Sequence, residues 1–256
     1  MKRAVFYLVS LICMIVLPFS LAGAASAEQE LIVSAAASLT NVFAEIGKKF
    51  ESANPATKVV FNFGASGALL QQIDKGAPVD VFASADQKTM DQAREKHLMV
   101  SEPPRAFAGN ELVLITPHGA RVPVKALKDL TGRQIGKVAL GNPETVPAGR
   151  YAKEVLTNEG LWEELKPKFI FGESVRQVLD YVSRGEVDAG FVFATDALIA
   201  KDHVKEALEA PQHKPITYPI SVVGSTKNEE LAMRFVDFVL SKEGEEILLR
   251  YGFKKP

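Results

Sequence analysis

The sequence has few of the side chains that carry most nucleophilic and metal chemistry. It contains one cysteine, Cys13, and four histidines in 256 residues. Cys13 lies in an apolar stretch near the N-terminus. It comes too early, and behind too bulky a residue, Ile12, to resemble a lipoprotein cleavage site. If that stretch is removed, the remaining chain has no disulfide, no thiolate nucleophile and no cysteine metal ligand.

The sequence also lacks an excess of charge and, after its first residues, a long apolar run. Its formal net charge is −1, so there is no bulk electrostatic attraction to nucleic acid. No later segment approaches the length needed to span a bilayer. These absences predict a soluble globular protein that does not bind nucleic acid.

The N-terminus has the pattern of a secretory signal. Lys2 and Arg3 precede an apolar core that extends to about Leu21, and the small residues Ala25–Ala27 form a cleavage site. A retained membrane anchor is the weaker alternative, since polar residues end the run. We expect residues 1–27 to be a cleaved signal peptide, and the remaining protein of about 229 residues to be periplasmic without a lipid anchor.

Beyond the signal, short apolar runs alternate with helical patterns, which is typical of an α/β fold. A final helix is predicted over Glu229–Leu240, with apolar residues on one face. The predicted strands are Leu31–Ser34, Lys58–Phe63, Val79–Ala83, Glu111–Thr116, Lys137–Leu140, Phe169–Phe171, Ala189–Phe193 and Tyr218–Val223.

Two stretches have the composition of domain junctions. Val100–Pro104 is polar and rich in proline, and Pro219–Gly224 precedes the last helix. Two junctions in one chain indicate a lobe inserted into another lobe.

Four predicted helices begin directly after a strand or a glycine-rich turn. Ser38 and Ser66 stand at two of these starts, Ala148 follows Pro147 at the third, and Ser174 precedes the fourth. Each start taken alone is explained by helix capping. Alternatively, several helix N-termini that point at one place form an anion site, because they carry unpaired N–H donors and a partial positive charge.

The motifs "AAASLTN", "GASG", "GAPVDVFASADQKTMD", "VPAGRYAKEVL" and "YGF" resemble those of the periplasmic molybdate-binding proteins of ABC importers. They follow the family's order along essentially the whole chain after the signal. The resemblance implies a ligand-binding protein without enzymatic activity or cofactor. It is expected to be a monomer that closes on one tetrahedral molybdate or tungstate and delivers it to a membrane permease.

The resemblance also implies the fold. This is the two-lobed periplasmic binding protein fold (type II) of the α/β class, in which each lobe is a mixed sheet flanked by helices. We expect residues 28–109 with 221–256 to form lobe 1, and residues 110–220 to form lobe 2.

In that family, serine hydroxyls and backbone N–H groups hold the oxyanion. Carried over by motif, the hydroxyls are those of Ser38 and Ser66, and the N–H groups those of Ala148 and Val175. In "GFVFATDA", Phe193 stands where the family often has a tyrosine that reaches the anion. One donor is therefore lost, and the nearby hydroxyls that could replace it are those of Thr145, Ser174 and Thr195.

A serine hydrolase is the alternative from another class, with Ser38 or Ser66 as the nucleophile. It would need a base within hydrogen-bond reach, and "GASG" is not the G-x-S-x-G nucleophile elbow. The four histidines all lie in stretches typical of surface loops: His97, His118, His203 and His213.

Charged residues near these motifs have structural explanations. Asp80 and Asp86 could be paired metal ligands, but no third ligand has suitable spacing. We expect Asp80 to support the lobe and Asp86 to cap a helix. Arg150 and Arg176 are expected to be solvated or rim charges.

Sulfate and phosphate are the alternative ligands. Hydrogen phosphate carries a proton and needs an acceptor, whereas ionised molybdate needs only donors. Sulfate also needs only donors but is smaller, so cavity size would have to discriminate against it.

Overall fold

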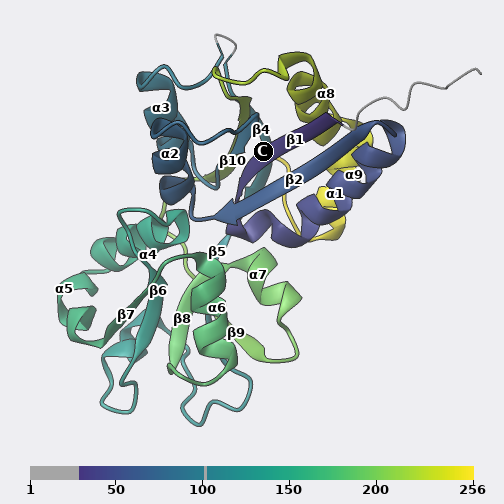
Figure 1. Cartoon of the computed structure of the whole chain (residues 1–256). Coiled ribbons are helices and arrows are strands. Elements are labelled where there is room, and N and C mark those ends of the chain that lie inside the picture. Colours follow the sequence, from purple (N-terminus) through teal and green to yellow (C-terminus); the bar gives the residue numbers. More distant parts are fainter. Residues whose placement is uncertain (1–28, 101–102) are drawn as a thin grey trace, which may run out of the picture.

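The computed structural model describes residues 29–100 and 103–256, and its elements fall into two groups around two sheets (Figure 1). The predicted signal peptide and Cys13 lie outside the described residues, as does part of the predicted junction Val100–Pro104. No helix within the described ranges is long and apolar enough to cross a membrane.

The first sheet has the strand order β2-β1-β3-β10-β4. β1 runs parallel to β2 and β3, and β10 runs antiparallel to β3 and β4. Its strands are β1 (Gln29–Ala36), β2 (Thr57–Gly64), β3 (Val81–Ala83), β4 (Arg105–Asn110) and β10 (Ile216–Val222).

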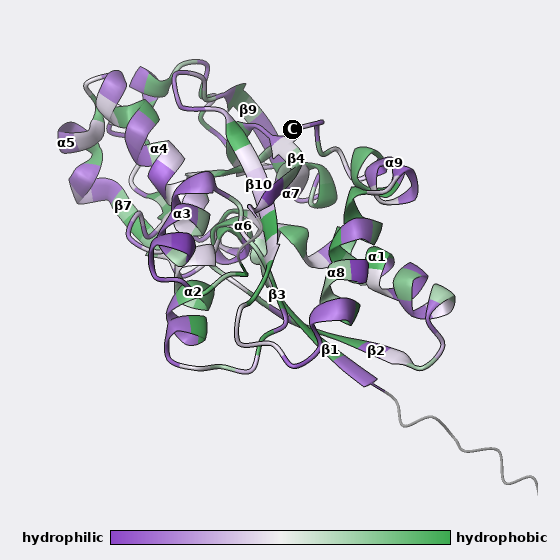
Figure 2. Ribbon diagram, turned by 90° about the horizontal axis from the view of Figure 1, so that it is seen from above, coloured by the Kyte–Doolittle hydropathy of each residue, from purple (hydrophilic) through white to green (hydrophobic). Residues whose placement is uncertain are grey.

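Helices cover the first sheet, and we call the sheet with its helices the first lobe. α1 packs on β2 and α9, α8 packs on β10, and α2 packs on β1 and α3. Figure 2 shows hydrophobic residues along the central strands and hydrophilic residues on outer helix surfaces. The helices are η1 (Ala37–Leu39), α1 (Thr40–Ala53), α2 (Ser66–Asp74), α3 (Gln87–Glu95), α8 (Glu229–Leu240) and α9 (Lys242–Arg250).

The second sheet has the order β7-β6-β8-β5-β9 and forms the second lobe with its helices. β6 is parallel to β7 and β8, and β5 is antiparallel to β8 and β9. The strands are β5 (Leu112–Pro117), β6 (Val138–Gly141), β7 (Phe169–Gly172), β8 (Ala189–Phe193) and β9 (Val204–Glu209). The helices are η2 (Leu127–Thr131), α4 (Pro147–Asn158), α5 (Trp162–Leu165), η3 (Lys166–Lys168), α6 (Val175–Ser183) and α7 (Ala194–Ile199).

The chain passes between the sheets twice. The first passage is Glu111 between β4 and β5, and the second is the segment 210–215 between β9 and β10. Pro219 lies inside β10, where the pairing with β4 shifts register. The residue limits of the lobes remain a proposal. Because β10 belongs to the first sheet and begins at Ile216, the end of the second lobe would lie a few residues before the predicted residue 220.

All eight predicted strands are present, and the helix predicted over Glu229–Leu240 is α8 with those bounds. It is not the final helix, contrary to the prediction, because α9 follows it. The α/β class with two mixed sheets is confirmed. The sequence analysis missed β4 and β9, each of which lies at an edge of its sheet. An edge strand has a neighbouring strand on only one side and carries more polar residues, so its apolar pattern is weak.

Candidate functional site

The predicted site residues line one small cavity between the two lobes. The cavity leaves about 10 Å³ for the centre of a water-sized molecule, which is about the room that one water molecule needs. Its walls are formed by Ala36, Ala37, Ser38, Gly64, Ala65, Ser66, Ala85, Val146, Pro147, Ala148, Val175 and Phe193.

The first lobe contributes two buried serines. Ser38 lies in η1 and Ser66 is the first residue of α2, and their exposed fractions are 2% and 0%. Neither hydroxyl caps its helix, so the capping interpretation is wrong for both. Ser38 Oγ lies 3.0 Å from the Tyr218 hydroxyl, and Ser66 Oγ accepts a hydrogen bond from the Ala85 N–H at 3.0 Å.

The second lobe contributes two helix starts. Ala148 is the second residue of α4, after Pro147, and Val175 is the first residue of α6. N–H groups in a first helical turn have no acceptor within their own helix. Ser174 does cap α6, because its Oγ accepts from the Gln177 N–H at 3.2 Å.

The cavity wall is uncharged. None of the described residues that line it is acidic, basic or a histidine. The positive potential must come from the helix N-termini of α2, α4 and α6, and the hydrogen bonds from hydroxyl and N–H groups. This arrangement can hold a small anion without a cationic side chain.

The arginines near the cavity are paired with carboxylates, so the interpretation of them as solvated charges was wrong. Arg150 Nη2 lies 2.7 Å from Asp86 Oδ2, and its side chain is 15% exposed. Arg150 also donates to the Thr89 hydroxyl at 2.7 Å. Asp86 and Thr89 belong to the first lobe and Arg150 to the second. The charge is paired across the lobes because burying it alone would be unfavourable.

Arg176 makes a similar bridge. Its Nε lies 2.6 Å from Oδ1 of Asp196, a fully buried carboxylate in α7, and its Nη1 donates to Asn41 Oδ1 of the first lobe at 2.8 Å. Burial raises the pKa of Asp196, and the Arg176 charge opposes this shift. Arg176 therefore ties α6 both to α7 and to the opposite lobe.

The lobes also meet through their backbones. The Gly67 N–H of α2 donates to the Thr145 carbonyl in the second lobe at 2.9 Å. A Cβ at position 67 would lie 2.8 Å from that oxygen, so the contact requires glycine.

The structural roles expected for the two aspartates are confirmed. Asp86 caps α3 by accepting from the Thr89 N–H at 3.2 Å. Asp80 accepts from the Ile32 N–H at 2.7 Å and from the Thr226 hydroxyl. In the part of the chain that the structure describes, no three His, Cys, Asp or Glu side chains are grouped as metal ligands.

The histidines lie away from the cavity. His97, His118 and His203 are exposed, and His213 is half-buried against the Tyr151 ring at 5.4 Å. None of them lines the cavity. Neither site serine has a histidine base beside it.

The hydroxyls considered as substitutes at Phe193 do not line the cavity. Ser174 caps α6, and Thr195 accepts from Asn110 Nδ2 at 2.9 Å. Thr145 Oγ1 is buried and has no hydrogen-bond partner among the described residues.

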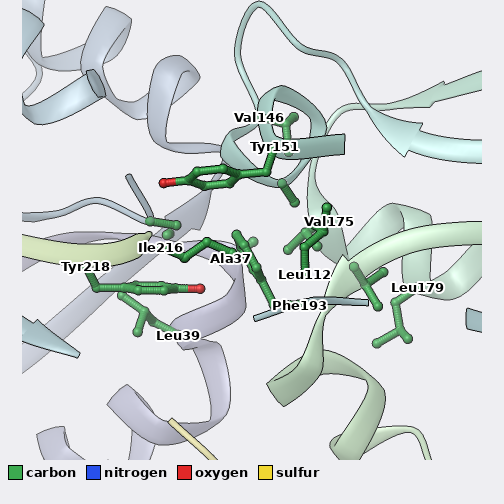
Figure 3. Packing of buried hydrophobic residues seen from close by; sticks show 14 of the residues in the cluster. Ala37, Leu39, Leu112, Val146, Tyr151, Val175, Leu179, Phe193, Ile216 and Tyr218 are labelled. Atoms are coloured by element: carbon green, nitrogen blue, oxygen red, sulfur yellow. The ribbon is translucent and has the colours of Figure 1, made fainter. Parts of the chain in front are cut away.

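Sequence reasoning missed the buried groups behind the cavity wall, Tyr218 and Asn110. Figure 3 shows Tyr218 beside Phe193, and their ring centroids are 5.8 Å apart. The only signal for Tyr218 was its place in a predicted strand beside a predicted junction.

Comparison with known proteins gives matches along nearly the whole chain. A family model described as "Bacterial extracellular solute-binding protein" matches residues 31–254. The "Putative ABC transporter substrate-binding lipoprotein YvgL" of Bacillus subtilis is 39% identical over 224 residues, covering 87% of this chain and 85% of that protein. The molybdate-binding protein ModA of Escherichia coli is 38% identical over 244 residues, covering 93% and 94%.

A solved structure agrees with the fold. The periplasmic molybdate-binding protein of Azotobacter vinelandii superposes with a TM-score of 0.79 at 25% identity, covering 88% of this chain and 99% of that one. The expected periplasmic binding protein fold is thereby confirmed.

Proposed function

The chain belongs to the bacterial extracellular solute-binding proteins, and from that premise we propose that it captures molybdate and delivers it to the permease of an ABC importer. One observation carries the proposal. Five residues chosen by motif, far apart in the sequence, line a single uncharged cavity between the lobes: Ser38, Ser66, Ala148, Val175 and Phe193.

The chemistry of these groups supports an oxyanion that accepts hydrogen bonds and carries no proton. Two hydroxyls and two N–H groups supply donors, and no carboxylate lines the cavity in the described residues. Hydrogen phosphate would leave its own proton without a charged acceptor. Tungstate has the same shape and charge as molybdate, so we propose it as a second ligand.

The cellular context is also part of the proposal. The N-terminal pattern of residues 1–27 supports export by a cleaved signal and a periplasmic location without a lipid anchor. A cavity lined by residues of both lobes of one chain is compatible with action as a monomer. The partner is the membrane permease that receives the anion.

Isothermal titration of the purified protein with molybdate, tungstate, sulfate and phosphate tests the proposal. Molybdate and tungstate are expected to bind in preference to the other two. Sulfate affinity comparable to that of molybdate would overturn the assignment.

The site itself is tested by Ser38→Ala and Ser66→Ala. Each removes a donor to a charged acceptor and is expected to weaken molybdate binding by about ten- to a hundredfold. Ser52→Ala is the matched control, since that exposed hydroxyl bonds only the Lys48 carbonyl of its own helix. Unchanged affinity in both site variants would mean that the anion binds elsewhere.

A further inference from the structure

A chain of buried hydrogen bonds lies behind Ser38. The Tyr218 hydroxyl is 3.0 Å from Ser38 Oγ and 3.2 Å from Asn110 Nδ2. Asn110 Nδ2 also donates to Thr195 Oγ1 at 2.9 Å. Tyr218 and Thr195 are 0% exposed and Asn110 is 7% exposed. These residues come from β10, β4 and α7, so the chain joins both lobes next to the passages between them.

The direction of each hydrogen bond in this chain is fixed. Asn110 Oδ1 accepts from the Glu111 N–H at 2.9 Å, and a backbone N–H can only donate. The amide nitrogen of Asn110 therefore faces Thr195 and Tyr218, and it donates one proton to each. The Tyr218 oxygen is an acceptor in that bond, and among the described residues Ser38 Oγ is the acceptor within reach of its proton. The Tyr218 hydroxyl therefore donates to Ser38 Oγ.

The Ser38 hydroxyl can therefore donate its own hydrogen bond to a ligand in the cavity. Its Oγ accepts from Tyr218, and no other partner of this oxygen is present among the described residues. Burial raises the pKa of Tyr218 well above its usual range, and the Asp196 charge adds to the shift, so the donated proton is retained. The Ser66 hydroxyl is arranged in the same way: its Oγ accepts from the Ala85 N–H, and its proton can be donated to a ligand.

We infer that Tyr218 is a positioning residue that orients Ser38 as a hydrogen-bond donor toward the cavity, and thereby favours fully deprotonated oxyanions there. The inference rests on the proposed function. Without the hydrogen bond from Tyr218, the Ser38 hydroxyl can rotate and accept a hydrogen bond from a protonated anion such as hydrogen phosphate. Tyr218 therefore acts on ligand choice through Ser38, without contact with the anion.

Tyr218→Phe is the direct test, because it keeps the ring that packs on Phe107 and Phe253 and removes only the hydroxyl. Molybdate affinity is expected to fall by about three- to tenfold, and the molybdate-to-hydrogen-phosphate affinity ratio, measured by competition, is expected to fall with it. Tyr151→Phe is the control: it removes a hydroxyl from another buried ring near Phe193, at 6.4 Å, that does not line the cavity. It should change neither value.

A double-mutant cycle separates positioning from a general structural role. If Tyr218 acts through Ser38, adding Tyr218→Phe to Ser38→Ala should cause no further loss of molybdate affinity. An equal loss in both backgrounds, or an unchanged affinity ratio in Tyr218→Phe, would overturn the inference. If the wild-type protein fails to bind molybdate, the proposed function falls instead.

Asn110→Asp provides a second variant should Tyr218→Phe not fold. A carboxylate at this position accepts a hydrogen bond from the Tyr218 hydroxyl, so Ser38 must donate to Tyr218 and is lost as a donor to the anion. The added charge repels all dianions alike, whereas the reversed polarity weakens molybdate more than hydrogen phosphate. A ratio equal to that of the wild type in this variant would also contradict the inference.

Discussion

The ring of Phe193 packs between two tyrosines at the cavity wall. Its centroid lies 5.8 Å from the Tyr218 ring and 6.4 Å from the Tyr151 ring, and it is 1% exposed. The rings fix its orientation, and it brings no hydrogen-bond donor to a cavity whose other polar contributors are donors. A tyrosine at position 193 would add one hydroxyl donor to the anion, and phenylalanine does not supply it.

Phe193→Tyr is expected to tighten molybdate binding by about 0.5–2 kcal/mol, the scale of one added hydrogen bond to a charged group. Isothermal titration measures the change. Phe171→Tyr, at a ring 48% exposed on β7, is the control and should have no effect. Weaker binding in Phe193→Tyr would show that another group already occupies the space at the distal end of the ring.

Some site residues could be predicted from the sequence because each stands at a helix start in a local motif. Ser38, Ser66 and Ala148 follow this rule, since the ends of strands and the starts of helices meet at one edge of a sheet. Tyr218 and Asn110 could not be found in this way. Their contacts join residues 180 and 108 positions apart, so only the folded chain brings them together.

At the level of elements, the start of α2 determines how closely the lobes approach. Gly67 lies in its first turn and touches the Thr145 backbone of the other lobe. Alanine is the better helix former by about 1 kcal/mol, so glycine at this position favours the contact between lobes at the expense of the helix.

Gly67→Ala is expected to keep or slightly raise the melting temperature while lowering molybdate affinity by about tenfold or more. Its Cβ would meet the Thr145 carbonyl at 2.8 Å and oppose closure, and a displacement of about 1 Å at a site can have a hundredfold effect. Gly119→Ala, where a Cβ meets nothing within 4 Å, is the control. Unchanged affinity in Gly67→Ala would show that the lobes close without this contact.

The edge strand β9 contains a glutamate, Glu206, whose ionisation affects the stability of the strand. Partial desolvation raises the pKa of Glu206, and repulsion from Glu209 and Glu111 adds to the shift. A carboxyl group with a raised pKa in the folded state favours folding when protonated, and this contribution is lost as the pH rises through the folded-state pKa. The ionised side chain therefore destabilises β9 at neutral pH.

Glu206→Gln is expected to raise the melting temperature at pH 7 by about 1–2 °C, since an exposed, screened charge contributes under about 0.5 kcal/mol. At about pH 3.5, below the ordinary pKa of glutamate, the two proteins should melt together. Glu243→Gln, at an exposed position of α9, is the control. An equal gain at both pH values would mean that charge is not the cause.

At the scale of the whole molecule, residues of both lobes line the cavity, so we expect an anion to enter when the lobes move apart. Their contacts near the cavity come from Arg150 with Asp86, Arg176 with Asn41, and the backbones of Gly67 and Thr145. The two passages between the sheets can act as a hinge, because each is short and lies at the ends of strands. A ligand with donors from both lobes favours the closed state by its differential affinity.

Small-angle X-ray scattering of the wild-type protein with and without molybdate tests this two-state behaviour. A compact chain of this length has a radius of gyration of about 17 Å, and molybdate is expected to reduce the measured value by a few per cent as the lobes close. Gly67→Ala serves as the comparison and should compact less, because its Cβ opposes the contact with Thr145. If the wild-type radius is the same with and without bound molybdate, the lobes do not open and close around the anion. The contacts of Arg150 and Arg176 would then be permanent links between the lobes, and exchange of the anion would require local opening at the cavity wall.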